Sequence, residues 1–342
     1  MSDTEPATPP LDPLTELAIR HGTDKWGPHF YTPIYHALFA HLRDRPVRLL
    51  EIGIGGYHLN TVGGSSLAMW AEYFPQGHIV GLDIMPKRLS LGPRVTTVAG
   101  SQTDTRLLAA LCDRHGPFDI VIDDGSHCPN HVSTSFYALF PRLADGGLYV
   151  IEDVQTAFWP EYGGSVLDGG ETMKLVTRLV ECLNHAEIKV VQPSGQVASF
   201  ASQVRSLRAF HNIIAIEKGD NGEPSNARYS LANPHAARAV RTIEAAMARA
   251  PTPEGLANLI DVYMMAGEVA KGAALVGDAL AKWPDHPALL SVASQIAQAR
   301  GDARGNLDCL RRLARLEPDN AALQQACDEA QAAMAAAAPG PG

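Results

Sequence analysis

Two pairs of acidic residues each follow a short apolar run that is typical of a buried parallel strand. The pair Asp123–Asp124 comes directly after residues 118–122, and the pair Glu152–Asp153 comes directly after residues 146–151. In an open α/β sheet, ligands bind outside the carboxyl ends of the strands. Two neighbouring strands that both end in carboxylates therefore favour a hard-cation site, and we expect the ion to be Mg²⁺.

His127 lies close behind the first acidic pair and is a candidate general base for proton transfer. The alternative is that these carboxylates cap the helices that follow, since Asp and Ser are favoured at such positions. One acidic strand end is more often a cap than a site. Two of them in register favour a metal or catalytic site.

A glycine-rich segment, Gly53–Gly56, follows the first predicted strand. Glycines at this point let the chain turn sharply and let a ligand approach the backbone. A dinucleotide-binding loop would have a further glycine where His58 stands, so the loop suits a nucleoside without a pyrophosphate. We expect Asp83, at the next strand end, to bind the ribose hydroxyls and Gln102 to lie beside the adenine. Together with Glu51 before the loop, these residues favour S-adenosylmethionine over NAD.

The elements that must position these residues alternate between strand and helix, which predicts a doubly wound parallel α/β sheet. We expect strands at 47–52, 78–84 and 94–99 and helices at 65–73 and 105–114, before the two strands that end at 122 and 151. A hairpin of residues 204–210 and 213–218, with a tight turn at His211–Asn212, completes the sheet.

The C-terminal third contains a repeat of helical segments. Gly267 and Gly301 are 34 residues apart, as are Pro284 and Pro318. This period is that of tetratricopeptide repeats, and the alternative is a plain helical bundle. We expect a methyltransferase-type domain at 1–232 with an N-terminal lid at about 14–45, a tetratricopeptide-like domain at 233–337 and a tail at 338–342.

Composition excludes several classes of protein. A formal net charge of −9 over 342 residues argues against a nucleic-acid binder, which needs a basic face. No apolar run approaches the length of a membrane span, and the first 13 residues do not resemble a signal peptide. Five scattered cysteines without a Cys-x-x-Cys pair are typical of free thiols in a cytoplasmic protein.

Several ordered blocks resemble the macrolide-sugar O-methyltransferases, which are metal-dependent class I methyltransferases of the mycinamicin and macrocin type. The resemblance spans about residues 14–226 and rests on His21–Lys25 with His29, Tyr31 and Tyr35, on Leu50–Tyr57, Asp123–His127, Gly147–Asp153 and His211–Gly219. The helical C-terminal third lies outside it.

The resemblance implies a class I S-adenosylmethionine methyltransferase fold with Mg²⁺ held by Asp124, Glu152 and Asp153. It also implies catalytic roles for Asp124 and His127, with His127 as the general base. We expect the cofactor to contact Thr23, Tyr31, Glu51, Gly53, Gly55, Tyr57, Ser65, Asp83, Ser101, Gln102 and Asp123. The glycine-containing segment Trp159–Gly170 is a candidate substrate loop, and His131 is either a positioning or a structural residue.

We therefore expect a Mg²⁺-dependent S-adenosylmethionine O-methyltransferase for a sugar hydroxyl of a glycosylated natural product, as in antibiotic biosynthesis. Three alternatives stay open: a cephalosporin-hydroxylase-like accessory enzyme, a methyltransferase for a carrier- or peptide-bound substrate docked by the repeats, and a non-catalytic scaffold. The expected partners are a small-molecule glycoside and a second copy of the chain, with a protein partner at the repeats and neither nucleic acid nor membrane.

Overall fold

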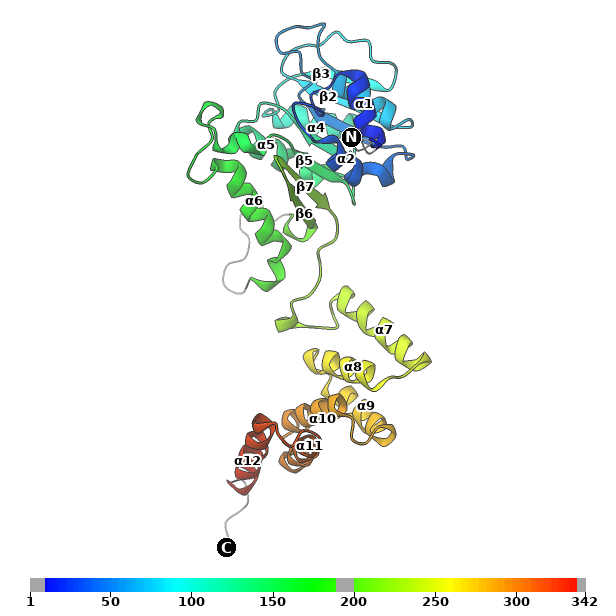
Figure 1. Cartoon of the computed structure of the whole chain (residues 1–342), viewed down its shortest axis with the longest axis vertical. Coiled ribbons are helices and arrows are strands. Elements are labelled where there is room, and N and C mark those ends of the chain that lie inside the picture. Colours follow the sequence, from blue (N-terminus) through cyan, green and yellow to red (C-terminus); the bar gives the residue numbers. More distant parts are fainter. Residues whose placement is uncertain (1–9, 189–199, 337–342) are drawn as a thin grey trace, which may run out of the picture. The chain divides into compact units, whose positions relative to one another are not determined.

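The computed structural model describes residues 10–188 and 200–336, which form two compact units drawn in Figure 1. The units are Met1–Asn221 and Gly222–Gly342. The sequence predicts the boundary after residue 232, but the 3-10 helix at Asn226–Arg228 packs on a helix of the second unit. The predicted tail at 338–342 lies outside the described residues.

Seven strands of the described residues form one sheet in the order β3-β2-β1-β4-β5-β7-β6. The first five strands are parallel, and β7 and β6 add an antiparallel hairpin beside β5. This confirms the predicted doubly wound α/β sheet with its terminal antiparallel hairpin. The strands are β1 (Arg48–Ile52), β2 (His78–Asp83), β3 (Val95–Ala99), β4 (Ile120–Asp123), β5 (Leu148–Ile151), β6 (Val204–Phe210) and β7 (Ile213–Lys218).

Helices cover both faces of this sheet, because apolar side chains alternate between the two faces along its strands and both faces must be buried. Leu49 of β1 packs with the N-terminal helices, while its neighbour Leu50 packs with the later ones. The first face carries α1 (Pro13–His21), α2 (Thr32–Phe39) and α3 (Ser65–Tyr73), and the second carries α4 (Thr105–His115), α5 (Pro129–Leu139) and α6 (Gly170–Leu183).

The register of the central strands brings the acidic residues to one edge of the sheet. Ile52 of β1 pairs with Asp123 of β4, which pairs in turn with Ile151 of β5. The residues that follow these three positions therefore leave the sheet side by side. The hairpin turn predicted at His211–Asn212 is also present, with Asn212 at a φ of 60°.

The regular secondary structure in the described residues of the second unit consists of helices, joined by short loops. Its helices are α7 (Pro234–Arg249), α8 (Pro253–Met265), α9 (Val269–Lys282), α10 (Pro287–Ala299), α11 (Ala303–Leu316) and α12 (Ala321–Ala336). The starts of α8 and α10 differ by 34 residues (287 − 253), and so do those of α9 and α11 (303 − 269). The helices thus recur with the predicted period, and their assignment as tetratricopeptide repeats stays a prediction.

Short 3-10 helices connect the larger elements, and one of them follows the second acidic pair. They are Ala40–Leu42, Phe140–Arg142, Val154–Phe158, Pro160–Tyr162, His185–Glu187, Ala201–Gln203 and Asn226–Arg228. Among the helices of the described ranges, none combines the length and the apolarity needed to span a bilayer.

Candidate active site

Three of the predicted catalytic and metal-binding residues meet beyond the ends of β4 and β5. Asp124, His127 and Asp153 each place one ligand atom within 4.8 Å of the other two. The distance from His127 Nε2 to Asp153 Oδ2 is 3.7 Å, and these side chains are 18% and 17% exposed. We call this set the outer cluster; it is partly open to ligands and offers the carboxylate and imidazole donors that divalent ions bind.

The backbone of the outer cluster is itself unusual. His127 and Asp153 have φ values of 57° and 50°, in the left-handed region that non-glycine residues rarely adopt. Such conformations concentrate at functional sites, where the surrounding structure holds them. The helix-capping alternative is not supported, because the residue before α5 is Cys128 and neither it nor Asp153 makes a side-chain cap bond.

A buried lysine, which the sequence did not lead us to expect, lies between the acidic strand ends. Lys25 Nζ is 2.6 Å from Glu152 Oε1, 2.9 Å from Asp124 Oδ2 and 3.2 Å from Glu51 Oε1. Only 1% of its side chain is exposed. We call Glu51, Asp124 and Glu152 the inner cluster, whose ligand atoms also lie within 4.8 Å of one another. The acidic strand ends could have indicated a cationic side chain nearby, since buried carboxylates need a counter-charge.

Two tyrosines of the N-terminal segment complete this arrangement. Tyr31 donates from its hydroxyl to Asp153 Oδ1 at 2.5 Å, and Tyr35 donates to the same Glu152 oxygen that contacts Lys25. The segment predicted as a lid is packed into the core through these residues, with Tyr35 fully buried. Its contacts with the carboxylates are direct, and its role toward a cofactor stays a prediction.

The ionisation of the inner cluster is set by burial and by Lys25. Burial lowers the pKa of Lys25, but the three surrounding carboxylates outweigh burial and hold that pKa above its usual value. Lys25 therefore carries a positive charge. Burial raises the pKa of Glu152, and the charge of Asp124 adds to the rise.

Asp153 of the outer cluster differs from Glu152. Burial opposes its ionisation, yet the hydrogen bond from Tyr31 and the nearby His127 leave the pKa of Asp153 below its usual value. Asp153 is thus an anion at neutral pH and can bind a cation.

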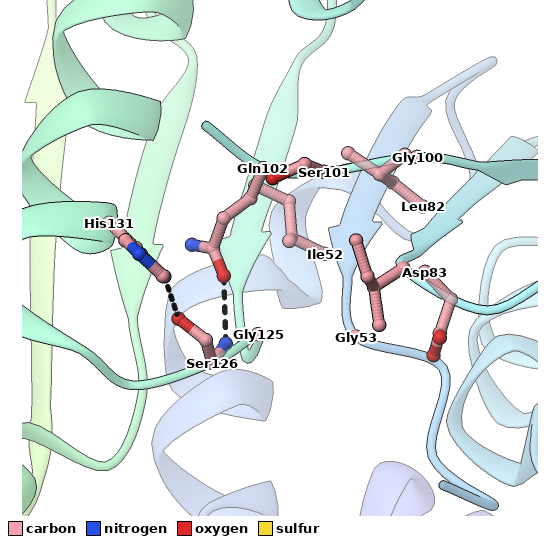
Figure 2. A pocket seen from close by; sticks show the side chains of 11 residues that line it. Ile52, Gly53, Leu82, Asp83, Gly100, Ser101, Gln102, Gly125, Ser126 and His131 are labelled. Carbon is pink, nitrogen blue, oxygen red and sulfur yellow. Dashed lines mark hydrogen bonds between the residues drawn. The ribbon is translucent and has the colours of Figure 1, made fainter. Parts of the chain in front are cut away.

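A pocket of about 220 Å³ opens at the carboxyl ends of β1, β2, β3 and β4 (Figure 2). Gly125 and Ser126 form one wall, and they belong to the loop that carries Asp124 and His127. The amide of Ser126 donates to Gln102 Oε1 at 2.7 Å, and its hydroxyl is 2.8 Å from His131 Nδ1. The full lining is Ile52, Gly53, Leu82, Asp83, Ile84, Gly100, Ser101, Gln102, Gly125, Ser126 and His131.

Four of the predicted cofactor residues line this pocket: Gly53, Asp83, Ser101 and Gln102. The side chains of Asp83 and Gln102 make hydrogen bonds within the protein. Asp83 accepts hydrogen bonds from the amides of Ile54 and Met85. Gln102 donates to Asp123 as well as accepting from Ser126, so its amide group joins two loops of the pocket wall.

The other predicted cofactor residues lie outside the lining. Asp123 is 1% exposed and accepts hydrogen bonds from Gln102, Ser135 and Tyr149, so it supports the loop from within the protein. Glu51 is fully buried in the inner cluster. The remaining ones, absent from the residues that line the pocket, are Thr23, Tyr31, Gly55, Tyr57 and Ser65.

Aromatic side chains from the predicted substrate loop approach the outer cluster. The ring of Tyr162 is 6.0 Å from the imidazole of His127 in an edge-on arrangement, and the ring of Trp159 is 6.0 Å from Tyr162. Trp159 is 42% exposed. The loop thus presents an accessible aromatic surface next to the candidate base.

Comparison with known proteins points to one group of enzymes. The chain is 48% identical over 215 residues to demethylmacrocin O-methyltransferase of Streptomyces fradiae, which covers 61% of this chain and 54% of that protein. It is 44% identical over 214 residues to mycinamicin VI 2''-O-methyltransferase of Micromonospora griseorubida, covering 61% of this chain and 53% of that protein.

A solved structure gives the same result. The MycE methyltransferase of the mycinamycin pathway, in complex with Mg, SAH and mycinamycin VI, superposes with a TM-score of 0.56 at 42% identity, covering 63% of this chain and 56% of that one. No family model matches the sequence. These matches confirm the resemblance to macrolide-sugar O-methyltransferases, although the chain spans about half the length of the curated relatives it matches.

Proposed function

We propose that this protein is a Mg²⁺-dependent S-adenosylmethionine O-methyltransferase that acts on a sugar hydroxyl of a glycosylated natural product. One observation carries the proposal. The loop from Asp124 to His127 supplies two residues to the pocket and two to the outer cluster, so a methyl donor and an acid–base centre would lie on either side of it. The names of the similar enzymes favour methyl transfer over the other reactions of such folds.

The donor set fits a divalent ion. Asp124 Oδ2 accepts a hydrogen bond from Lys25 and Asp153 Oδ1 accepts one from Tyr31. Asp124 Oδ1 and Asp153 Oδ2 are therefore proposed as the ligand atoms. We propose Asp124 and Asp153 as the accessible ligands, together with Glu152 as the most enclosed of the three, at 3% exposed. A bound Mg²⁺ would supply positive charge that favours loss of a proton from a substrate hydroxyl.

His127 is suited to receive that proton. Its imidazole is partly exposed, lies 3.7 Å from Asp153 Oδ2 and is held by a strained backbone. A general base in this position would accept the proton of the substrate hydroxyl. S-adenosylmethionine would supply the methyl group to the hydroxyl oxygen and leave as S-adenosylhomocysteine.

The acceptor would lie against the aromatic loop. Trp159 and Tyr162 present flat apolar surfaces beside His127, and such surfaces suit the apolar faces of a sugar ring or an aglycone. The similar enzymes are O-methyltransferases named for demethylmacrocin and for mycinamicin VI. Self-association, and docking of a protein partner on the helical unit, stay predictions.

Binding and turnover measurements test the proposed function. Calorimetric titration of the purified chain with S-adenosylmethionine and S-adenosylhomocysteine should give micromolar binding of both, with NAD⁺ inactive. Methylation of glycosides should require Mg²⁺, and Asp124→Asn should abolish it while cofactor affinity changes by less than about tenfold. Asp113→Asn is the matched control, since the Asp113 side chain is 71% exposed and pairs with Arg142, which is not a residue of the site. Absence of binding of either sulfur nucleoside contradicts the proposal.

A further inference from the structure

The inner cluster has the composition of a second cation site. Glu51, Asp124 and Glu152 come from three adjacent strand ends, and an oxygen of each lies within 4.8 Å of the others. Hard divalent ions bind in such sets of carboxylates. In this protein, however, the centre of the set holds the ammonium group of Lys25, at 2.6 to 3.2 Å from the three oxygens.

The inner and outer clusters share one residue. Asp124 contributes to both, with Oδ2 bonded to Lys25. The two positions are thus neighbours in the manner of two-metal sites, in which a carboxylate lies between the ions. They differ in access, because Glu51 and Glu152 have side chains 0% and 2% exposed, whereas the side chain of Asp124 is 26% exposed.

We propose that Lys25 is a positioning residue whose ammonium group permanently fills the inner of two adjoining cation positions and so restricts the site to one divalent ion. The inference rests on the proposed divalent-ion site, whose accessible ligands Asp124 and Asp153 belong to the outer cluster. The fixed charge of Lys25 holds Asp124 in place without consuming both of its oxygens. Because the ammonium is covalently attached, the inner position stays filled whatever ions are present.

Removal of the ammonium should open the inner position. The buried carboxylates of Glu51 and Glu152, together with the partly exposed one of Asp124, would then lack their counter-charge, which is costly unless another cation enters. Ca²⁺ takes oxygen ligands at about 2.3–2.6 Å, which is close to the 2.6 Å between Lys25 Nζ and Glu152 Oε1. Mn²⁺ also suits carboxylate sites. The vacated space therefore needs little rearrangement to accept a divalent ion.

The test counts bound ions in the full chain. Mn²⁺ stoichiometry is measured by calorimetry and by metal analysis after dialysis, in the original protein and in Lys25→Met, which removes the charge but keeps a long side chain. We expect the number of ions to rise from about one to about two per chain. Lys25→Arg retains the charge, and Tyr35→Phe removes only a hydrogen bond to Glu152, so both controls should bind about one ion.

Thermal unfolding provides the second readout. Mn²⁺ should raise the unfolding temperature of Lys25→Met far more than that of the original protein, since the ion replaces a missing internal charge. If Lys25→Met folds only when Mn²⁺ is present and then holds two ions, the proposal is equally supported.

Two results overturn the inference. One is a Lys25→Met chain that binds a single ion with the original affinity, and the other is a chain that no concentration of Mn²⁺ restores to the folded state. Failure of the original protein to bind any ion is a different result, because it refutes the proposed outer site. In that case, uptake of one ion by Lys25→Met alone would still assign the inner position to the ammonium.

Discussion

Gly53 lies where the end of β1 passes the loop that joins the pocket to the outer cluster. Its φ is +92°, and a Cβ atom added there would lie 2.0 Å from the carbonyl oxygen of Asp124 and 3.2 Å from Gly125 Cα. These are backbone atoms, which cannot move aside without moving the loop. Gly53→Ala is therefore predicted to displace both the pocket wall and the carboxylate of Asp124.

The size of the effect follows from two separate terms. A left-handed conformation costs a residue with a Cβ about 1–2 kcal/mol, and overpacking against the interior costs about 1–3 kcal/mol more. The free energy of unfolding of Gly53→Ala should thus fall by about 2–5 kcal/mol. Gly55→Ala is the matched control, because Gly55 has a φ of +72° but no atom within 4 Å of the added Cβ. It should lose only the first term, about 1–2 kcal/mol.

Urea unfolding followed by circular dichroism measures the stability difference between the two variants, and calorimetry measures their affinity for S-adenosylmethionine. Gly53→Ala should bind the cofactor at least about tenfold more weakly than Gly55→Ala, since the displaced loop lines the pocket. Equal stability and equal affinity of the two variants would refute the reasoning, because the contact with Asp124 would then have no energetic consequence.

Three further outcomes are expected. His127→Ala should bind cofactor and Mn²⁺ normally but turn over about 10²–10⁴-fold more slowly, and loss of binding would show instead a structural role. Trp159→Ala should raise the KM for the glycoside roughly 2- to 10-fold with kcat retained, as measured by steady-state kinetics. A thiol reagent should label Cys128 and Cys327 in the native chain, since the other described thiols are buried. Burial also raises the pKa of one of these, Cys112, to about 11. Mass mapping that finds Cys112 labelled first would contradict this.

The sequence was sufficient to predict the sheet and the position of the outer cluster. The apolar runs are short and end in glycine or acidic residues, and β6 and β7 begin and end where the pattern placed them. Parallel strands in register bring whatever follows them to the same edge. For that reason Asp124 and Asp153 could be placed together although 29 residues separate them (153 − 124).

The direction of individual side chains could not be predicted in the same way. Asp123 and Asp124 are adjacent and chemically alike, yet the first accepts three hydrogen bonds inside the protein and the second faces the site. Alternation along a strand requires that they diverge, but it does not say which one faces inward. That choice depends on Ser135 of α5 and Tyr149 of β5, whose positions follow only from tertiary packing.

Lys25 could not be assigned for a related reason. It is 99 residues from Asp124 and 127 from Glu152 in the chain, and lysines are seldom buried. Its segment shows neither strand nor helix periodicity, so the sequence suggested a lid over the cofactor. Burial of its side chain is stable only because three carboxylates meet at the same point, and that meeting exists only in the folded sheet.

The N-terminal segment is therefore part of the candidate active site rather than an appendage to it. Lys25, Tyr31 and Tyr35 supply donors to carboxylates at the ends of β4 and β5, and Lys25 also reaches Glu51 at β1. Asp153 is an anion at neutral pH and makes no contact with the Lys25 ammonium, so the site remains attractive to cations. Both of the proposed ligands, a divalent ion and a sulfonium, are cations. The donors of this segment thus stabilise carboxylates that lie close together in the folded protein. They leave negative charge at the site, which the proposed chemistry needs.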